Sequence, residues 1–229
     1  MLKIIGLRGK SRSGKNTLAA HLVQQYGYFE IALADPMKRF LMEVFDISPN
    51  LLWGHSSLRE VEIGPPLPKL DVVSVQPDGS STKMGEMPYG TPLTPRRLLQ
   101  TLGTEWGRSM LENVWVNYTF RVIEKMAGSE GYVYDPLKGV VVHPQGRLTR
   151  WKGAIITDVR FDNESIALRD KGHTVVYLHR PSTGEPIPAM NHASETQVIK
   201  LPHERLLLND VGIDAFKAKG AQLLEDVLR

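Results

Sequence analysis

The sequence contains no cysteine among its 229 residues. A disulfide framework, a thiolate metal site and a cysteine nucleophile are therefore excluded. Long apolar runs are also missing, because no stretch approaches the roughly 18 consecutive apolar residues that a membrane span requires. The apolar run before Arg8 is too short for a secretory signal. We therefore expect a cytoplasmic protein that does not interact with a membrane.

Positive charge is in small excess, because the chain has 28 Lys and Arg and 25 Asp and Glu, which gives a net charge of +3. This balance does not favour a non-specific nucleic-acid binder, and a mild basic excess suits a protein that binds phosphate-bearing ligands. Seven histidines are present without an HExxH motif, which argues against a metalloenzyme. Hydrophobic residues at 41% and charged residues at 23% are ordinary for a globular protein with one core.

Segments with strand and helix patterns alternate along the chain. We expect strands at 2–7, 29–34, 153–158, 174–180 and 206–209. We expect helices at 16–26, at 36–45 with Asp35 as N-cap, at 164–171 and at 213–228, and a long helical stretch from 95 to about 126 interrupted at Gly103. This order predicts an α/β fold, in which a five-stranded parallel sheet is covered by helices on both faces. Ligands of such sheets bind at the carboxyl ends of the strands.

Two segments depart from this alternation. Residues 63–95 are rich in proline and glycine and predict loops with room for one hairpin. Residues 128–152 alternate around turn residues and predict an inserted hairpin. We therefore expect a single domain over 1–229, in which 46–95 is an insertion close to the ligand and 128–152 a second insertion.

The strongest motif follows the first expected strand and precedes the first expected helix. Residues 9–17, GKSRSGKNT, match the G-x-x-x-x-G-K phosphate loop. Gly9 and Gly14 allow successive backbone N–H groups to point at an anion, and the helix N-terminus adds partial positive charge. Lys15 would reach the β- and γ-phosphates of a nucleotide. Asn16 takes the place of the usual magnesium-binding hydroxyl, and Thr17 follows it.

The strand expected at 153–158 ends in an acid, as a Walker-B strand does. Asp158 would orient the water shell of magnesium near the phosphates. Arg160 follows at the mouth of the same strand. A strand cap for Asp158 and a surface salt bridge for Arg160 are the alternatives.

The long helical stretch carries a polar stripe without Lys or Glu. Its members are Arg97, Gln100, Thr104 and Arg108, at helical spacing, while Leu98, Leu99, Leu102 and Trp106 take the other side. Two guanidinium groups with a Gln and a Thr between them suit a phosphate and a hydrogen-bonding base. Lys38 and Arg39 add a cationic pair after the second strand. An ordinary solvated face is the alternative for both groups.

In the order GKSRSGKNT, ALADPMKRF, RRLLQTLGTEWGR, ITDVRFDNE, LHRP and NHASE, the sequence resembles the deoxynucleoside monophosphate kinases of tailed bacteriophages. The resemblance covers most of the chain but does not extend to residues 46–92 and 128–152. It implies a P-loop kinase in the host cytoplasm, with ATP as donor, magnesium as cofactor and small-molecule nucleotides as partners; a homodimer is one state left open.

The resemblance also implies residue roles. The ATP site would comprise Gly9, Arg12, Ser13, Gly14, Lys15, Asn16 and Thr17, with Arg180 at a lid over 180–195 and Asn209 at the adenine. The acceptor site would comprise Lys38, Arg97, Gln100, Thr104 and Arg108. Lys15, Asp158 and Arg160 would be catalytic. Other small-molecule P-loop kinases, of the dephospho-coenzyme A or phosphomevalonate type, remain alternatives, as do a P-loop ATPase module and a nucleotide-binding regulator.

Overall fold

The fold was analysed in a computed structural model of the chain. It describes residues 2–67, 70–75, 80–87, 91–128, 131–143, 151–181 and 198–228, and all structural statements below concern these residues. They form two compact units, one of residues 1–33 and 115–229 and the other of residues 34–114. Each unit is described by itself. Whether the chain works as the single domain that we expected stays a prediction.

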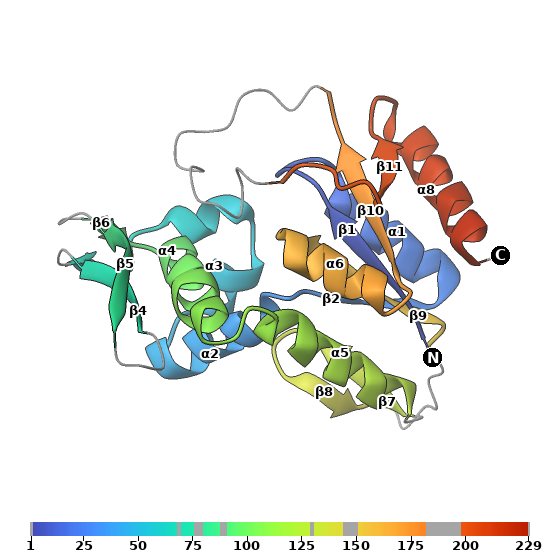
Figure 1. The fold of residues 1–229 in the computed structure, drawn as a ribbon. Helices are drawn as coiled ribbons and strands as arrows, with labels where there is room; N and C mark the ends of the chain where they lie inside the picture. The colour runs from blue at the N-terminus through green and yellow to red at the C-terminus, as the bar shows by residue number, and fades with distance from the viewer. Residues whose placement is uncertain are drawn as a thin grey trace. The chain divides into compact units, whose positions relative to one another are not determined.

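The first unit is built on a parallel sheet of five strands in the order β11-β10-β1-β9-β2 (Figure 1). The strands are β1 (Lys3–Arg8), β2 (Tyr28–Ile31), β9 (Gly153–Val159), β10 (Thr174–His179) and β11 (Arg205–Leu208). Its helices are α1 (Lys15–Tyr26), α5 (Val114–Ala127), α6 (Asp162–Asp170) and α8 (Ile213–Leu228). All pairings within this sheet are parallel, so the α/β fold class with a five-stranded sheet is confirmed.

Alternation along the central strand places helices on both faces of the sheet. Ile5 and Leu7 pack in one cluster with α1 and α8, through residues such as Leu18 and Phe216. Ile4 packs in the other cluster, with α5 and α6. Successive side chains of a strand point to opposite faces, so one apolar strand serves two cores. The resulting layers, helices over sheet over helices, are visible in Figure 1.

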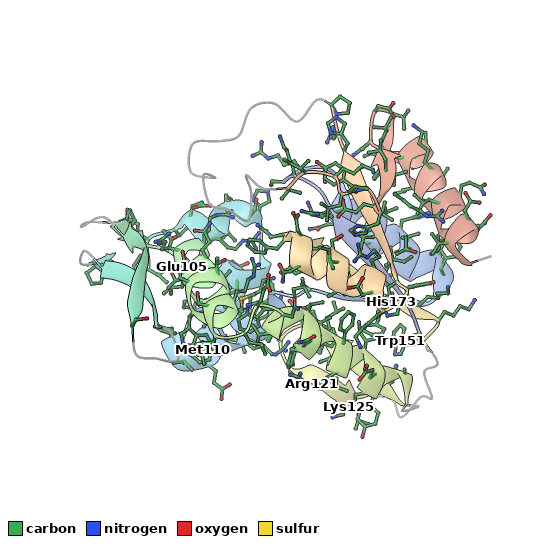
Figure 2. The ribbon with its side chains drawn as sticks, in the orientation of Figure 1. Glu105, Met110, Arg121, Lys125, Trp151 and His173 are labelled. Atoms are coloured by element: carbon green, nitrogen blue, oxygen red, sulfur yellow. The ribbon has the colours of Figure 1, made fainter. Side chains whose placement is uncertain are left out.

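The expected hairpin segment contains two antiparallel strands, β7 (Tyr132–Asp135) and β8 (Gly139–Val142). Trp151, labelled in Figure 2, ties this segment to the sheet. Its indole N–H donates to the carbonyl of Tyr132 at 3.2 Å, and its ring meets Phe29 of β2 nearly edge-on, with centroids 5.5 Å apart. This contact joins the inserted hairpin to the core of the first unit.

The second unit contains short helices and two strand pairs. The helical elements are α2 (Asp35–Phe45), α3 (Pro49–Trp53), the 3₁₀-helix η1 (Ser56–Glu60), α4 (Pro95–Gln100) and a π-helix, η2 (Thr101–Arg108). The strands are β3 (Gly64–Leu67), β4 (Leu70–Val75), β5 (Ser81–Met87) and β6 (Thr91–Leu93). Its core is formed by Leu41, Ile47 and Leu52, against which Leu98, Leu99 and Leu102 pack.

The expectation of loops with one hairpin over 63–95 was wrong in part, because two antiparallel pairs form there, β3 with β6 and β4 with β5. Prolines concealed the first pair in the sequence. Pro65 and Pro66 lie where the register between Gly64 and Leu67 shifts. Proline is compatible with an edge strand or an irregularity of this kind, since its missing N–H is not needed there.

No helix of the described residues is both long and apolar enough to cross a bilayer.

Tyr28 is a buried residue whose replacement should be tolerated. Its side chain is 1% exposed, and its hydroxyl has no hydrogen-bond partner within the described part of the chain. Tyr28→Phe should therefore keep or raise the free energy of unfolding, by up to about 1 kcal/mol, because an unsatisfied buried hydroxyl is removed. Chemical denaturation at neutral pH measures this, and a clear loss of stability would contradict it.

The same variant should change the alkaline limit of stability. Burial raises the pKa of Tyr28 above its ordinary value of 10.0. The unfolded chain then releases this proton first, so stability present below about pH 10 is lost as the pH rises further. Tyr28→Phe should lose less stability on going from about pH 9 to 11. Burial raises the pKa of Tyr177 as well, so part of the alkaline loss should remain.

Candidate functional site

The phosphate loop joins the end of β1 to the start of α1, as predicted. Its backbone enters the left-handed region at Gly9 (φ 144°), Arg12 (φ 62°) and Gly14 (φ 103°). Alternation of this kind turns successive N–H groups toward one side and makes an anion-binding concavity. Space also requires the glycines, since a Cβ at Gly9 would lie 2.4 Å from the carbonyl oxygen of Leu178 and one at Gly14 would lie 2.6 Å from Nδ2 of Asn209.

Lys15 is the first residue of α1, and its side chain bends back over the loop. Its Nζ lies 2.7 Å from the carbonyl oxygen of Gly9 and 2.8 Å from that of Lys10. The loop therefore orients the ammonium group with its own carbonyl oxygens. A cation held this way lies beside the concavity where the amides would bind phosphate.

Asn209 fixes the loop from the far edge of the sheet. Its side-chain amide donates to the carbonyl of Ser13 at 3.0 Å, and its backbone N–H donates to the carbonyl of His179 at 2.8 Å. Ser13 is 1% exposed and Asn209 is half-buried, so the bond is partly shielded from solvent. We expected Asn209 at the adenine of ATP; the structure shows in addition that it supports the loop, and the adenine contact stays a prediction.

The remaining residues of the predicted ATP site surround the same loop. Asn16 and Thr17 are exposed on the first turn of α1, and Arg12 is exposed in the loop. Arg180 is exposed after β10. Of the lid predicted over 180–195, residues 182–195 lie outside the described part of the chain.

Asp158 and Arg160 lie at the carboxyl end of β9, next to β1. The parallel register pairs Gly6 with Ile156 and Arg8 with Val159, so the acid emerges beside the strand that leads into the loop. One carboxylate oxygen of Asp158 accepts from the backbone N–H of Leu33 at 2.6 Å. This hydrogen bond is the one expected if Asp158 caps the strand, which was the alternative interpretation. A role of Asp158 in binding magnesium stays a prediction.

The second unit holds the predicted acceptor residues. Arg97, Gln100, Thr104 and Arg108 are half-buried, which differs from an ordinary solvated face. The helix carrying them is not the expected α-helix up to Gly103. It is α-helical to Gln100, becomes a π-helix over Thr101–Arg108, and a new helix starts at Val114.

The π-helix changes which residues face the core. Leu98, Leu99 and Leu102 pack inward as expected, but Trp106 is 53% exposed, so its assignment to the apolar side was wrong. A π-helix bonds i to i+5 and winds wider than 3.6 residues per turn, so the expected periodicity fails after Thr101. Gly103 lies against α2, because a Cβ there would be 2.8 Å from the sulfur of Met37.

Lys38 forms a small cluster with Asp35 and Trp53. Its Nζ lies 3.7 Å from Oδ1 of Asp35 and 5.3 Å from the centre of the Trp53 ring, and the indole N–H of Trp53 donates to Oδ1 of Asp35 at 3.0 Å. Asp35 is the first residue of α2 and Ala34 is the N-cap, so the predicted capping role was wrong. Nothing in the sequence indicated Asp35 and Trp53 as partners of Lys38.

Arg8 was also missed, because in the sequence it only ends an apolar run. It is 0% exposed. Nη1 donates to Glu204 at 2.7 Å, and Nη2 donates to Asp162. Burial alone would lower the pKa of Arg8, but the hydrogen bonds to Glu204 and Asp162 and the charges of these carboxylates together raise it. The signal available in the sequence was a charged residue at the end of a buried strand.

The donor set suits magnesium. Within the described residues no group of three or more His, Cys, Asp or Glu side chains gathers as a metal site would. Magnesium needs no such cage, since it keeps several waters and binds through one or two carboxylates together with substrate phosphates. Asp158, on the strand that pairs with β1, and the side-chain oxygens of Asn16 and Thr17 are hard donors of this kind, and magnesium binding stays a prediction.

The chain has low sequence and structural similarity to several proteins that are named as kinases. No family model matches it. A protein of Acanthamoeba polyphaga mimivirus named "Putative deoxynucleotide monophosphate kinase" is 25% identical over 214 residues, which cover 93% of this chain and 91% of that protein.

Solved structures resemble it more weakly. A sugar kinase from Janibacter sp. HTCC2649 has a TM-score of 0.43 at 12% identity, covering 98% of this chain and 95% of its own. A gluconokinase from Sinorhizobium meliloti 1021 has a TM-score of 0.43 at 13% identity, and the match covers 99% of this chain and 95% of the gluconokinase. A dephospho-CoA kinase from Campylobacter jejuni has a TM-score of 0.40 at 11% identity, and the match covers 98% of this chain and 97% of that kinase.

Proposed function

We propose that the chain transfers the γ-phosphate of ATP to a deoxynucleoside monophosphate and so produces the diphosphate. The observation that carries the proposal is the glycine loop with Lys15 bent back over it, between a buried parallel strand and a helix N-terminus. The name of the mimivirus relative supports the acceptor class. The half-buried Arg97, Gln100, Thr104 and Arg108 support an anionic acceptor with a polar base.

The chemistry requires positioning and charge neutralisation more than proton transfer. The loop amides and Lys15 would bind the β- and γ-phosphates of the donor and stabilise charge as it moves to the leaving group. Magnesium, when bound with ATP, supplies further charge neutralisation, and Asp158 would hold it through water. The acceptor phosphate is already ionised, so no strong general base is needed. Arg160 would add positive charge near the migrating phosphoryl group.

A coupled assay of ADP release tests the proposal. We expect ADP release to depend on an added deoxynucleoside monophosphate, with little turnover of ATP alone. ADP release that is the same without any acceptor would favour an ATPase module instead. Release with dephospho-coenzyme A or phosphomevalonate, and not with any monophosphate, would favour the other small-molecule kinases.

Arg97→Lys should damage the acceptor side selectively. Lysine keeps the charge but loses the planar fork that binds two phosphate oxygens together. We expect the KM for the monophosphate to rise about tenfold, which corresponds to about 1.4 kcal/mol, while the KM for ATP hardly changes. Gln100→Ala should alter the ranking among bases more than the overall rate. Steady-state kinetics with each substrate varied in turn measures both.

Arg96 offers the matched control on the same helix, because its guanidinium pairs with Glu60. Arg96→Lys should leave both KM values nearly unchanged. Equal loss for ATP and the monophosphate in Arg97→Lys would mean that Arg97 supports the fold and that the acceptor site lies elsewhere.

A further inference from the structure

Arg8 occupies a defined position relative to the candidate active site. It is the last residue of β1, and the phosphate loop begins at the next residue, Gly9. Its side chain is fully buried, and each terminal nitrogen donates to a different carboxylate, Nη1 to Glu204 and Nη2 to Asp162. A planar guanidinium with two bound carboxylates fixes direction as well as distance.

The two carboxylates come from segments that belong to the site. Asp162 lies in the first turn of α6, four residues after Asp158 and two after Arg160. Glu204 precedes β11, the strand that ends just before Asn209. Arg8 therefore connects the start of the phosphate loop with both the Asp158–Arg160 segment and the strand leading to Asn209.

Further bonds hold Glu204 in place. One of its oxygens accepts from Oγ of Ser165 at 2.6 Å as well as from Arg8, and the other accepts from the backbone N–H of Leu201 at 2.8 Å. Oγ of Ser165 also lies 2.9 Å from Nε2 of His203. Glu204 is thus a rigid anchor, with a side chain that is 0% exposed, whereas that of Asp162 is 59% exposed.

We propose that Arg8 is a positioning residue, which uses Glu204 as an anchor to hold the Asp162 end of α6, and with it Asp158 and Arg160, in register with the phosphate loop. This inference rests on the proposed function. A buried ion pair contributes little net stability, because desolvation of the charges offsets their attraction. The arrangement is therefore better explained by the geometry that it imposes on two catalytic segments.

Asp162→Asn tests this with little risk to folding, since the side chain is more than half exposed. Asparagine keeps an acceptor oxygen but loses the charge that strengthens the bond to Nη2, so the hold on α6 should weaken and the preceding segment should shift relative to the loop. A misplacement of about 1 Å can cost on the order of a hundredfold in rate. We expect kcat to fall about tenfold, with the KM for ATP within about twofold, because the loop itself binds the donor.

Asp170→Asn is the matched control, at the other end of α6, with a side chain 58% exposed and paired with Arg169. It should leave kcat unchanged. Melting temperatures of the two variants should agree, which separates positioning from stability. Arg8→Lys should resemble Asp162→Asn, because one ammonium cannot hold both carboxylates in a fixed plane.

The outcomes are distinct. If the wild-type chain transfers phosphate and Asp162→Asn matches Asp170→Asn in kcat, the inference is overturned and the proposed function stands. If kcat and melting temperature fall together in Asp162→Asn, the network supports only the fold and the inference is again overturned. If the wild-type chain shows no transfer to any monophosphate, the proposed function fails and the inference fails with it.

Discussion

Lys15→Ala is expected to lower the turnover number about a thousandfold or more, with the chain still folded. The ammonium group of Lys15 stabilises the negative charge that develops as the phosphoryl group is transferred. Loss of this side chain therefore removes on the order of several kcal/mol of transition-state stabilisation. Its Nζ contacts the carbonyl oxygens of Gly9 and Lys10 and, at 3.5 Å, Oγ of Ser13, all in the loop itself. These partners belong to the loop and to neither hydrophobic cluster of the sheet, so the fold should persist without the side chain.

Single-turnover rates with saturating ATP and monophosphate measure the effect, and circular dichroism with thermal unfolding checks the fold. Lys125→Ala is a suitable control, since Lys125 is exposed on α5 (Figure 2). It should retain the wild-type rate. A folded Lys15→Ala variant with near-normal turnover would rule out the kinase assignment.

Asp158→Asn is expected to lower kcat about a hundredfold while the KM for ATP changes little, because the role of magnesium grows as charge moves to the leaving group. The substitution should preserve the hydrogen bond that Asp158 makes to the backbone. Asparagine keeps an oxygen that can still accept from the N–H of Leu33, the bond that Asp158 makes at 2.6 Å. The variant therefore removes the charge and should keep the hydrogen bond between β9 and Leu33, two residues after β2.

The magnesium dependence of kcat should be measured in the same experiment, and the concentration for half-maximal activity should rise. Asp226→Asn, at an exposed position near the end of α8, is the control and should behave as wild type. Unchanged kcat together with unchanged magnesium dependence would reduce Asp158 to a strand cap.

The β1–loop–α1 unit and the sheet around it could be predicted from the residues alone. Glycine spacing, strand-length apolar runs and helical periodicity are local properties, and a glycine at φ 103° is needed wherever this loop forms. For this reason the places of Lys15, of Asp158 and of the five strands followed from the residues alone.

The support that distant residues give to that loop could not be predicted in this way, because it depends on tertiary contacts. Arg8 bonds Glu204, and Asn209 bonds Ser13, each across 196 positions of sequence, and no periodicity relates residues so far apart. The π-helix at Thr101–Arg108, which exposes Trp106, accompanies the close packing of Gly103 on Met37. Such contacts depend on which side chains meet once the elements have packed, and that information is non-local.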